Sequence, residues 1–216
     1  MSFSVFFPVY DKLTAGEKQL LDQSVTLRKF TKGTTIHSAE TDCLGLLLIR
    51  SGQLRAYMMS DEGKEFTVYR LFERDMCLFS ASCLMKSIQF DITITAEKDT
   101  EAWHIPPVVY RQLMDKSIVI SNYTNELMAT RFTDVMWLVE QIMWRSFDKR
   151  LADFLLQESE IENTPCLKIT HEQIASHLGT AREVVTRMLK YFQTEGAVKL
   201  TRGTIEIIDS DLLEEI

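Results

Sequence analysis

Two capping-box patterns ten residues apart constrain this chain more than any other feature of its sequence. Thr170 opens the first pattern and Thr180 opens the second, and each is followed three residues later by a Gln or a Glu. Gly179, which tolerates a positive φ, stands directly before the second pattern. We therefore expect helices over about 171–178 and 181–194, and a turn this short forces the two helices to cross steeply.

The residues around this turn have the spacing of a helix-turn-helix motif. Ala175 is small enough to let the two helices approach closely, and Gly179 follows it by four residues. Val185 lies six residues after the glycine, and Met188 lies three residues after that. The apolar contact between the helices is assigned to Ile174, Leu178, Val185, Met188 and Leu189.

The second predicted helix carries side chains that suit the edges of DNA bases. Arg182 and Arg187 match the two acceptors of guanine, and Glu183 can accept from the cytosine amino group. Because an acid beside phosphates is costly, Glu183 between two arginines favours base readout over a simple phosphate clamp. The alternative is that Glu183 only caps its helix and that the arginines form a solvated face.

A hairpin is expected behind the second helix. Two alternating strands over 197–208 meet at Arg202-Gly203, which makes this segment a wing whose tip can reach a phosphate. The candidate DNA-contacting residues are Thr170, Thr180, Arg182, Glu183, Thr186, Arg187, Lys190 and Arg202.

The charge balance is acidic overall but basic around this motif. The chain carries a net charge of −7, which by itself argues against a nucleic-acid partner. Residues 178–203, however, hold five cations and two anions, whereas residues 206–216 hold five acids and no base. Because electrostatic fields decay within about 10 Å at physiological salt, a local basic face on an acidic protein is compatible with DNA binding.

Residues 1–115 predict a β-rich domain. Short apolar runs alternate with turn signals at Lys32-Gly33, Arg50-Ser51-Gly52 and Asp61-Glu62-Gly63, a pattern typical of an antiparallel barrel or jelly roll. A short helix is expected before the strands, because Thr14 and the Glu three residues later form a further capping box.

A stretch without Gly or Pro over residues 109–144 predicts a long helix of about 30 residues. Its seam positions follow the 3,4 spacing of a heptad: Ile118, Ser121, Asn125, Met128, Phe132, Val135, Val139 and Ile142. The apolar half of this seam, Met128 to Ile142, is the expected dimerisation face, since Trp137 and Trp144 add apolar surface beyond one face. A core helix packed on its own barrel is the alternative.

A break with a new helix N-cap is expected at Ser146-Phe147-Asp148. Residues 148–158 then predict an amphipathic helix with three large apolar residues on one face, and residues 158–165 predict a polar loop that ends in proline.

Three parts follow from these patterns, and together they make an α+β fold. Residues 1–115 form a sensory jelly-roll β-barrel, and residues 116–145 form the dimerisation helix. Residues 146–216 form a winged helix-turn-helix DNA-binding domain.

With its parts in this order, the chain resembles the cyclic-AMP-receptor/FNR (CRP/FNR) family of bacterial transcription regulators. Residues 47–54 and 60–65 look like the family's cyclic-nucleotide-binding-like sensory β-roll, and the long helix matches its dimer helix. Arg182-Glu183-x-x-x-Arg187 is similar to the DNA-reading pattern of the catabolite-activator branch, while Thr186 stands where the FNR branch commonly has Ser.

This resemblance implies a homodimer that binds a pseudo-palindromic operator with GTGA-like half-sites. Arg182 would read a guanine, Glu183 a cytosine and Arg187 a second guanine across the pair. It also implies that RNA polymerase is a partner, and that an effector acts at the β-roll.

The segment 75–85 departs from the family's effector pocket. Cyclic-nucleotide binders carry a Gly-Glu pair and an Arg-Ser pair there, and neither pair is present. Residues 76–85 hold no charge, whereas a phosphodiester needs a cation or several N–H donors, so the sequence argues against cyclic AMP as the effector. The candidate pocket residues are Cys77, Ser80, Ser82 and Cys83, and the effector stays unidentified.

The cysteines and histidines do not favour a particular cofactor. A [4Fe–4S] cluster needs four thiolates, and the FNR branch places three of them near the N-terminus, whereas the first cysteine here is Cys43. Cys77 and Cys83 could serve a thiol or metal sensor, although free cysteines are more often small core residues. His104 could bind haem in a redox or gas sensor, with a satisfied core histidine as the alternative.

Other classes of function find little support. No Ser/His/Asp, HExxH, GxGxxG or P-loop pattern is present, so an enzyme is not expected. The longest apolar run has seven residues, against about 20 for a membrane-spanning helix, and no secretory signal is read, so we expect the protein in the cytoplasm. A sensor or scaffold whose winged domain binds protein is the alternative to a DNA-binding regulator.

Overall fold

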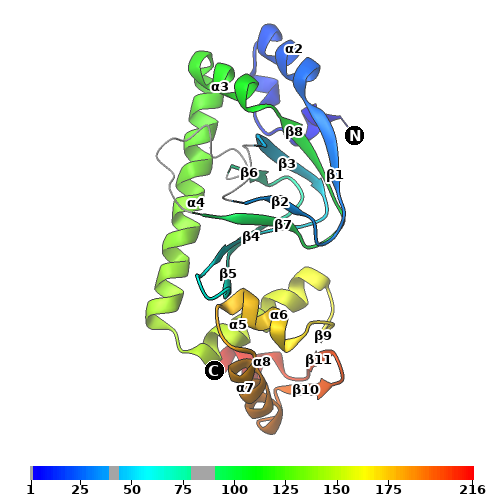
Figure 1. Cartoon of the computed structure of the whole chain (residues 1–216), viewed down its shortest axis with the longest axis vertical. Coiled ribbons are helices and arrows are strands. Elements are labelled where there is room, and N and C mark those ends of the chain that lie inside the picture. The colour runs from blue at the N-terminus through cyan, green and yellow to red at the C-terminus, as the bar shows by residue number, and fades with distance from the viewer. Residues whose placement is uncertain (1, 39–43, 79–90) are drawn as a thin grey trace. The chain divides into compact units, whose positions relative to one another are not determined.

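The computed structural model of the chain describes residues 2–38, 44–78 and 91–216 (Figure 1). The chain divides into two compact units, of which the first comprises Met1–Met59 and Val68–Val135. The second comprises Ser60–Thr67 and Met136–Ile216. The first unit is rich in β-strands, whereas the second is mostly helical and contains a small sheet.

Two four-stranded sheets form the β-sandwich of the first unit. One has the order β1-β8-β3-β6, made of Thr26–Phe30, Thr100–Ile105, Leu46–Ser51 and Met76–Cys77. The other has the order β2-β7-β4-β5, made of Thr35–His37, Thr93–Ala96, Leu54–Met59 and Glu65–Leu71. Leu47 from the first sheet and Ile94 from the second are both fully buried in one apolar cluster, so the two sheets share a core. The predicted jelly-roll domain is confirmed, as a β-sandwich.

Gly52 shows how closely the turns of this sandwich are packed. Its φ is +94°, and a Cβ there would lie 2.4 Å from the carbonyl oxygen of Asp99. The turn between β3 and β4 therefore requires glycine, both for its backbone conformation and for the close approach of a neighbouring chain segment.

Short helices close one end of the sandwich. They are α1 (Phe3–Phe6), the 3₁₀ helix η1 (Tyr10–Lys12), α2 (Ala15–Ser24) and α3 (Pro107–Lys116). The predicted capping box at Thr14 and Glu17 is present at the start of α2. Leu21 of α2 and Tyr110 of α3 are fully buried in a second cluster that also takes in Leu46 of β3.

The predicted long helix is present as α4, Ile118–Trp144, but it begins later than the uninterrupted pattern suggested. Ser117 has an extended backbone and separates α3 from α4. Early in α4, Ile120 is fully buried, and Met128 packs against the core of the sandwich. Among the described residues, no helix is both long enough and apolar enough to span a membrane.

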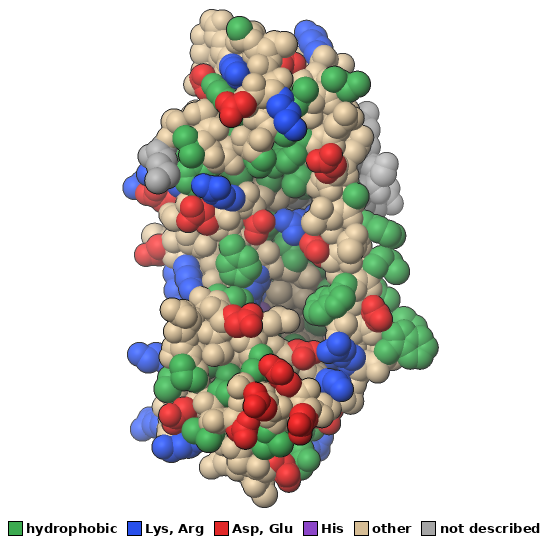
Figure 2. Space-filling view, turned by 180° about the vertical axis from the view of Figure 1, so that it is seen from behind, with side chains coloured by type: hydrophobic (Ala, Val, Ile, Leu, Met, Phe, Trp, Pro, Cys, Tyr) green, Lys and Arg blue, Asp and Glu red, His purple; other side chains and the backbone are tan. Residues whose placement is uncertain are grey.

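The later half of α4 exposes a row of large apolar side chains. Phe132, Val139 and Ile142 are 67%, 40% and 49% exposed in the single chain. Figure 2 shows hydrophobic side chains projecting along the edge of the molecule that α4 occupies. We call the residues Phe132, Val139 and Ile142 the exposed seam.

The C-terminal part of the second unit is a winged helix-turn-helix. Its helices are α5 (Phe147–Glu162), α6 (His171–Leu178), α7 (Arg182–Thr194) and α8 (Ser210–Glu215). Its sheet has the order β10-β11-β9, made of Val198–Thr201, Thr204–Ile207 and Cys166–Leu167. Leu151, Ile174 and Leu189 come from three helices and are fully buried in one core. The predicted wing hairpin therefore has a third strand.

Two local expectations about α5 need correction. The predicted break is present, with Ser146 as the N-cap, but the helix extends to Glu162 instead of ending near residue 158. Most of the segment 158–165 is thus helical instead of a loop, because Glu is a good helix former although it is polar. The helix ends at Asn163, which adopts the left-handed conformation with φ 51°.

Candidate nucleic-acid interface

The first helix of the motif, α6, begins with the predicted capping box. The Thr170 hydroxyl accepts from the backbone N–H of Gln173 at 3.2 Å, and the Gln173 side-chain oxygen accepts from the Thr170 N–H at 2.9 Å. Gly179 ends the helix in the left-handed conformation, with φ 65°. These local contacts set both ends of α6.

The prediction of a second capping box at Thr180 is wrong. The N-cap of α7 is Ala181, and it makes no side-chain capping hydrogen bond. The backbone N–H of Thr180 donates instead to the carbonyl of Ala175 at 3.1 Å, which completes the C-terminal turn of α6. Thr180 thus belongs to the end of the first helix, and one more residue is needed before the second can start.

Packing between α6 and α7 follows the predicted pattern. Ala175 and Ile174 of α6 are buried, and so are Val185 and Leu189 of α7. Val185 and Leu189 are four residues apart, so they share one face of α7, and this face is buried. The opposite face of α7 therefore points outward.

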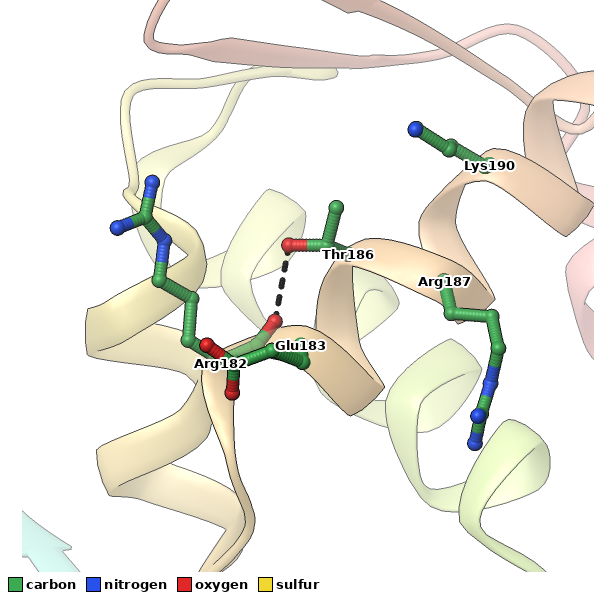
Figure 3. A pocket seen from close by; sticks show the side chains of 5 residues that line it. All are labelled: Arg182, Glu183, Thr186, Arg187 and Lys190. Atoms are coloured by element: carbon green, nitrogen blue, oxygen red, sulfur yellow. Dashed lines mark hydrogen bonds between the residues drawn. The ribbon is translucent and has the colours of Figure 1, made fainter.

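The outward face of α7 carries the predicted reading residues. Arg182, Glu183, Arg187 and Lys190 are exposed, and Thr186 is half-buried. Together they line one shallow depression on the surface of the helix. Figure 3 shows the Arg182 and Arg187 side chains extending in different directions, with Glu183 next to Arg182 at the start of the helix. The arrangement offers cationic donors and an anionic acceptor over about two turns of the helix.

Thr186 has two hydrogen-bond partners inside the protein. Its hydroxyl donates to the carbonyl oxygen of Arg182 at 2.9 Å, and His171 Nδ1 lies 2.8 Å from the same hydroxyl oxygen (Figure 3 draws the first of these bonds). His171 is the first residue of α6, so this contact joins the starts of the two helices. Nothing in the sequence pairs His171 with a residue fifteen positions later, so this contact was not predicted.

A second depression lies between the start of α6 and the wing. Its lining comes from Ile169–Glu172, from Arg182 of α7, and from Thr201 and Gly203–Ile205 of the hairpin. We call it the wing cleft. Arg202, at the tip of the hairpin, is exposed, and in the sequence it lies between the cleft residues Thr201 and Gly203. The cleft places Arg182 and the Thr204 hydroxyl at the N-terminus of α6, where the helix dipole favours an anion, beside the Glu172 carboxylate.

Only one of the four candidate effector-pocket residues is among those that the structure describes. Ser80, Ser82 and Cys83 lie outside the described residues. Cys77, in β6, is fully buried in the apolar cluster that the two sheets share. Arg131 of α4 lies over the ring of Tyr69, 4.8 Å from its centroid, and burial raises the pKa of Tyr69 well above its usual value. A buried aromatic and an arginine thus lie on the side of the sandwich next to α4.

The structure also places the residues considered for metal or haem. His104 Nε2 lies 2.5 Å from the Leu44 carbonyl oxygen and its Nδ1 lies 3.4 Å from the Thr26 hydroxyl, so both ring nitrogens face protein partners. This is the arrangement of a satisfied structural histidine. Within the three described ranges, no three His, Cys, Asp or Glu side chains are grouped closely enough to hold a metal ion.

Comparison with known proteins agrees with this architecture. The model of the Crp-like helix-turn-helix domain matches residues 149–216, and that of the cyclic nucleotide-binding domain matches residues 27–117. A solved structure from Eubacterium rectale, described as a transcriptional regulator of the Crp/Fnr family, has 58% sequence identity. The match covers 98% of this chain and 100% of that one, with a TM-score of 0.95. The chain belongs to the CRP/FNR family.

This CRP/FNR protein is therefore a DNA-binding transcription regulator, as its motifs predicted. Among curated proteins, the cyclic AMP receptor protein of Thermus thermophilus is 26% identical over 97% of this chain and 96% of its own length. The c-di-GMP responsive global regulator CLP of Xanthomonas campestris shares the fold, with a TM-score of 0.74 over 91% of this chain and 100% of its own. Its sequence identity is 16%, so the likeness concerns the fold alone.

Proposed function

We propose that this CRP/FNR regulator reads a pseudo-palindromic operator directly, with one α7 helix in the major groove of each half-site. The observation that carries the proposal is the outward, exposed trio of Arg182, Glu183 and Arg187 on α7. Helix-turn-helix proteins place the start of their second helix against base edges, and this trio lies there.

The chemistry of the three side chains supports a GTGA-like half-site. Arg182 and Arg187 each present the planar fork that matches N7 and O6 of guanine, and the Glu183 carboxylate accepts from the amino group of cytosine. Lys190 and Arg202 are exposed cations at which phosphate contact is expected, while Thr170 and Thr180 stand at the ends of α6. Phosphate contacts position the protein, and the trio supplies sequence preference.

A homodimer is proposed because the exposed seam of α4 continues the heptad. Met128 and Val135 are half-buried in the single chain, whereas Phe132, Val139 and Ile142 are exposed. An apolar row of this kind on a long helix is stabilised when a second copy covers it. Two recognition helices would then face half-sites about one helical turn of DNA apart.

Control by an effector at the β-sandwich completes the proposal. Residues 1–115 would sense, residues 116–145 would dimerise and relay the signal, and residues 146–216 would bind DNA. The sequence of residues 76–85 offers no charge to a phosphodiester, which argues against cyclic AMP as the effector. RNA polymerase is the expected further partner, in the cytoplasm.

The test is a comparison of Arg182→Ala with Arg202→Ala in operator binding. Arg182→Ala is expected to lose about 1–3 kcal/mol of discrimination between a GTGA-like duplex and a random duplex. Arg202→Ala, at the wing, is expected to weaken both duplexes equally and to lower the salt dependence of binding. Equal weakening of both duplexes by Arg182→Ala would show that it does not read bases. A wild-type protein that binds no duplex even at low salt would favour a protein partner for the winged domain.

A further inference from the structure

The hydrogen bonds of Thr186 determine which nitrogen of His171 carries a proton. A hydroxyl has one proton to donate, and the Thr186 hydroxyl donates it to the Arg182 carbonyl at 2.9 Å. The His171 Nδ1, 2.8 Å from the same oxygen, must therefore be the donor in that contact. In a neutral imidazole only one nitrogen is protonated, so Nε2 of the neutral ring is an acceptor without a proton.

His171 also lines the wing cleft. His171 is half-buried and lines this cleft together with Arg182 and the hairpin residues Thr201 and Thr204. The Thr204 hydroxyl and the N–H groups of the first two residues of α6, which have no intrahelical partner, suit a phosphate oxygen in this cleft. An unprotonated Nε2 does not suit a phosphate oxygen, because both atoms are hydrogen-bond acceptors.

We propose that His171 binds a phosphate of the DNA backbone in its protonated form, while its Nδ1–H continues to hold Thr186, so that operator binding takes up one proton at each half-site. This inference rests on the proposed function and adds a contact to it. It also makes Thr186 a positioning residue for the first turn of α7, since the proton of its hydroxyl is already engaged by the protein.

The charges that face His171 set the direction of the effect. Glu172 on its own helix and Arg182 on α7 line the cleft, while the hairpin contributes the uncharged residues Thr201 and Gly203–Ile205. Burial, and secondarily the charge of Arg182, lower the pKa of His171 below its ordinary value of 6.5, so the ring is neutral in the free protein at pH 7. A bound phosphate favours the cation and raises that pKa. The pKa of His171 is therefore higher in the DNA-bound protein than in the free protein. The affinity for DNA increases as the pH falls from above the first of these pKa values to below the second.

The experiment measures binding of the full-length protein to a duplex with two GTGA-like half-sites between about pH 8 and about pH 5.5. If the phosphate raises the pKa by about one unit, affinity increases about tenfold per half-site across this range. His171→Asn keeps an N–H that can reach Thr186 but cannot titrate, and it is expected to bind with an affinity that changes little with pH. Thr186→Val is expected to flatten the profile too, because it frees the neutral ring to carry its proton on Nε2.

Each outcome decides between the inference and the function on which it rests. A wild-type affinity that does not change with pH, or the same pH profile in His171→Asn, overturns the role of His171 and leaves operator binding intact. Failure of the wild type to bind any duplex at low salt overturns the proposed function itself. If His171→Asn does not fold, ring ¹⁵N chemical shifts of the wild type give the answer. The neutral ring must carry its proton on Nδ1 in the free protein, and the doubly protonated ring must persist to a higher pH with duplex than without it; any other pattern refutes the inference.

Discussion

Removing one apolar side chain from the exposed seam is expected to weaken the homodimer in proportion to the surface that the single chain leaves uncovered. Ile142→Ala removes three carbons, which contribute ~0.8 kcal/mol each when they move from full exposure to full burial, or ~2.4 kcal/mol together. Ile142 is 49% exposed. About half of this amount, ~1.2 kcal/mol per subunit, is therefore gained when a partner covers it.

The dimer contains the substitution twice, so its dissociation free energy falls by ~2.4 kcal/mol, which is about 50-fold in the dissociation constant. Sedimentation equilibrium over a range of protein concentrations measures this constant directly. The estimate assumes that Ile142 becomes fully covered, so the measured change also reports how completely the seam is buried.

Ile208→Ala is a matched control for this experiment. Ile208 is 56% exposed, the same type of residue, and it lies after β11, away from the heptad. Its replacement is expected to leave the dissociation constant unchanged. If both variants dissociate like the wild type, or if Ile208→Ala weakens the dimer as much as Ile142→Ala, then the exposed seam is not the dimer interface.

The other predictions concern stability and pH. Leu189→Ala, in the fully buried core of the winged domain, is expected to cost ~2–5 kcal/mol of unfolding free energy in chemical denaturation, and a loss below ~1 kcal/mol would contradict the packing described. Thr170→Ala removes a reciprocal cap and should cost ~1 kcal/mol, whereas Thr180→Ala should cost less because Thr180 is not an N-cap; equal losses would show that Thr180 does cap α7. Burial raises the pKa of Tyr110 from 10.0 to about 12, so the neutral phenol stabilises the fold below pH 10 and this stabilisation disappears between pH 10 and about pH 12. Tyr110→Phe should lose less stability than the wild type over that range, and identical alkaline denaturation profiles would contradict this.

Much of the winged domain was predictable because its signals are local. A capping box joins residues three positions apart, and the Thr170–Gln173 pair forms within a single helical turn. Gly179 marks the turn because a positive φ is easy for glycine alone. Thr180 misled the same reasoning, since its N–H was already engaged by Ala175 in the preceding helix. A capping pattern identifies candidates, but competition for the same backbone group decides between them.

The heptad of α4 was predictable in its position but not in its packing. A period of 3.5 residues shows which side chains share a face, and it does not show what covers that face. In the structure Met128 packs against buried residues of the first unit, whereas the later seam residues Phe132, Val139 and Ile142 are exposed. The core-helix alternative therefore describes the early part of α4, and dimerisation through its later part stays a prediction.

The sequence by itself determined the order of the parts, the ends of α6, and the outward face of α7 with its arginines and acid. These depend on contacts within a few residues or on one helical period, so they can be read along the chain. Only the tertiary structure decided that His171 holds Thr186 and lines a cleft with the wing, and that Met128 is covered while Phe132 is not. Such contacts join residues far apart in the chain, and their geometry depends on how the helices and strands pack, which no local pattern specifies.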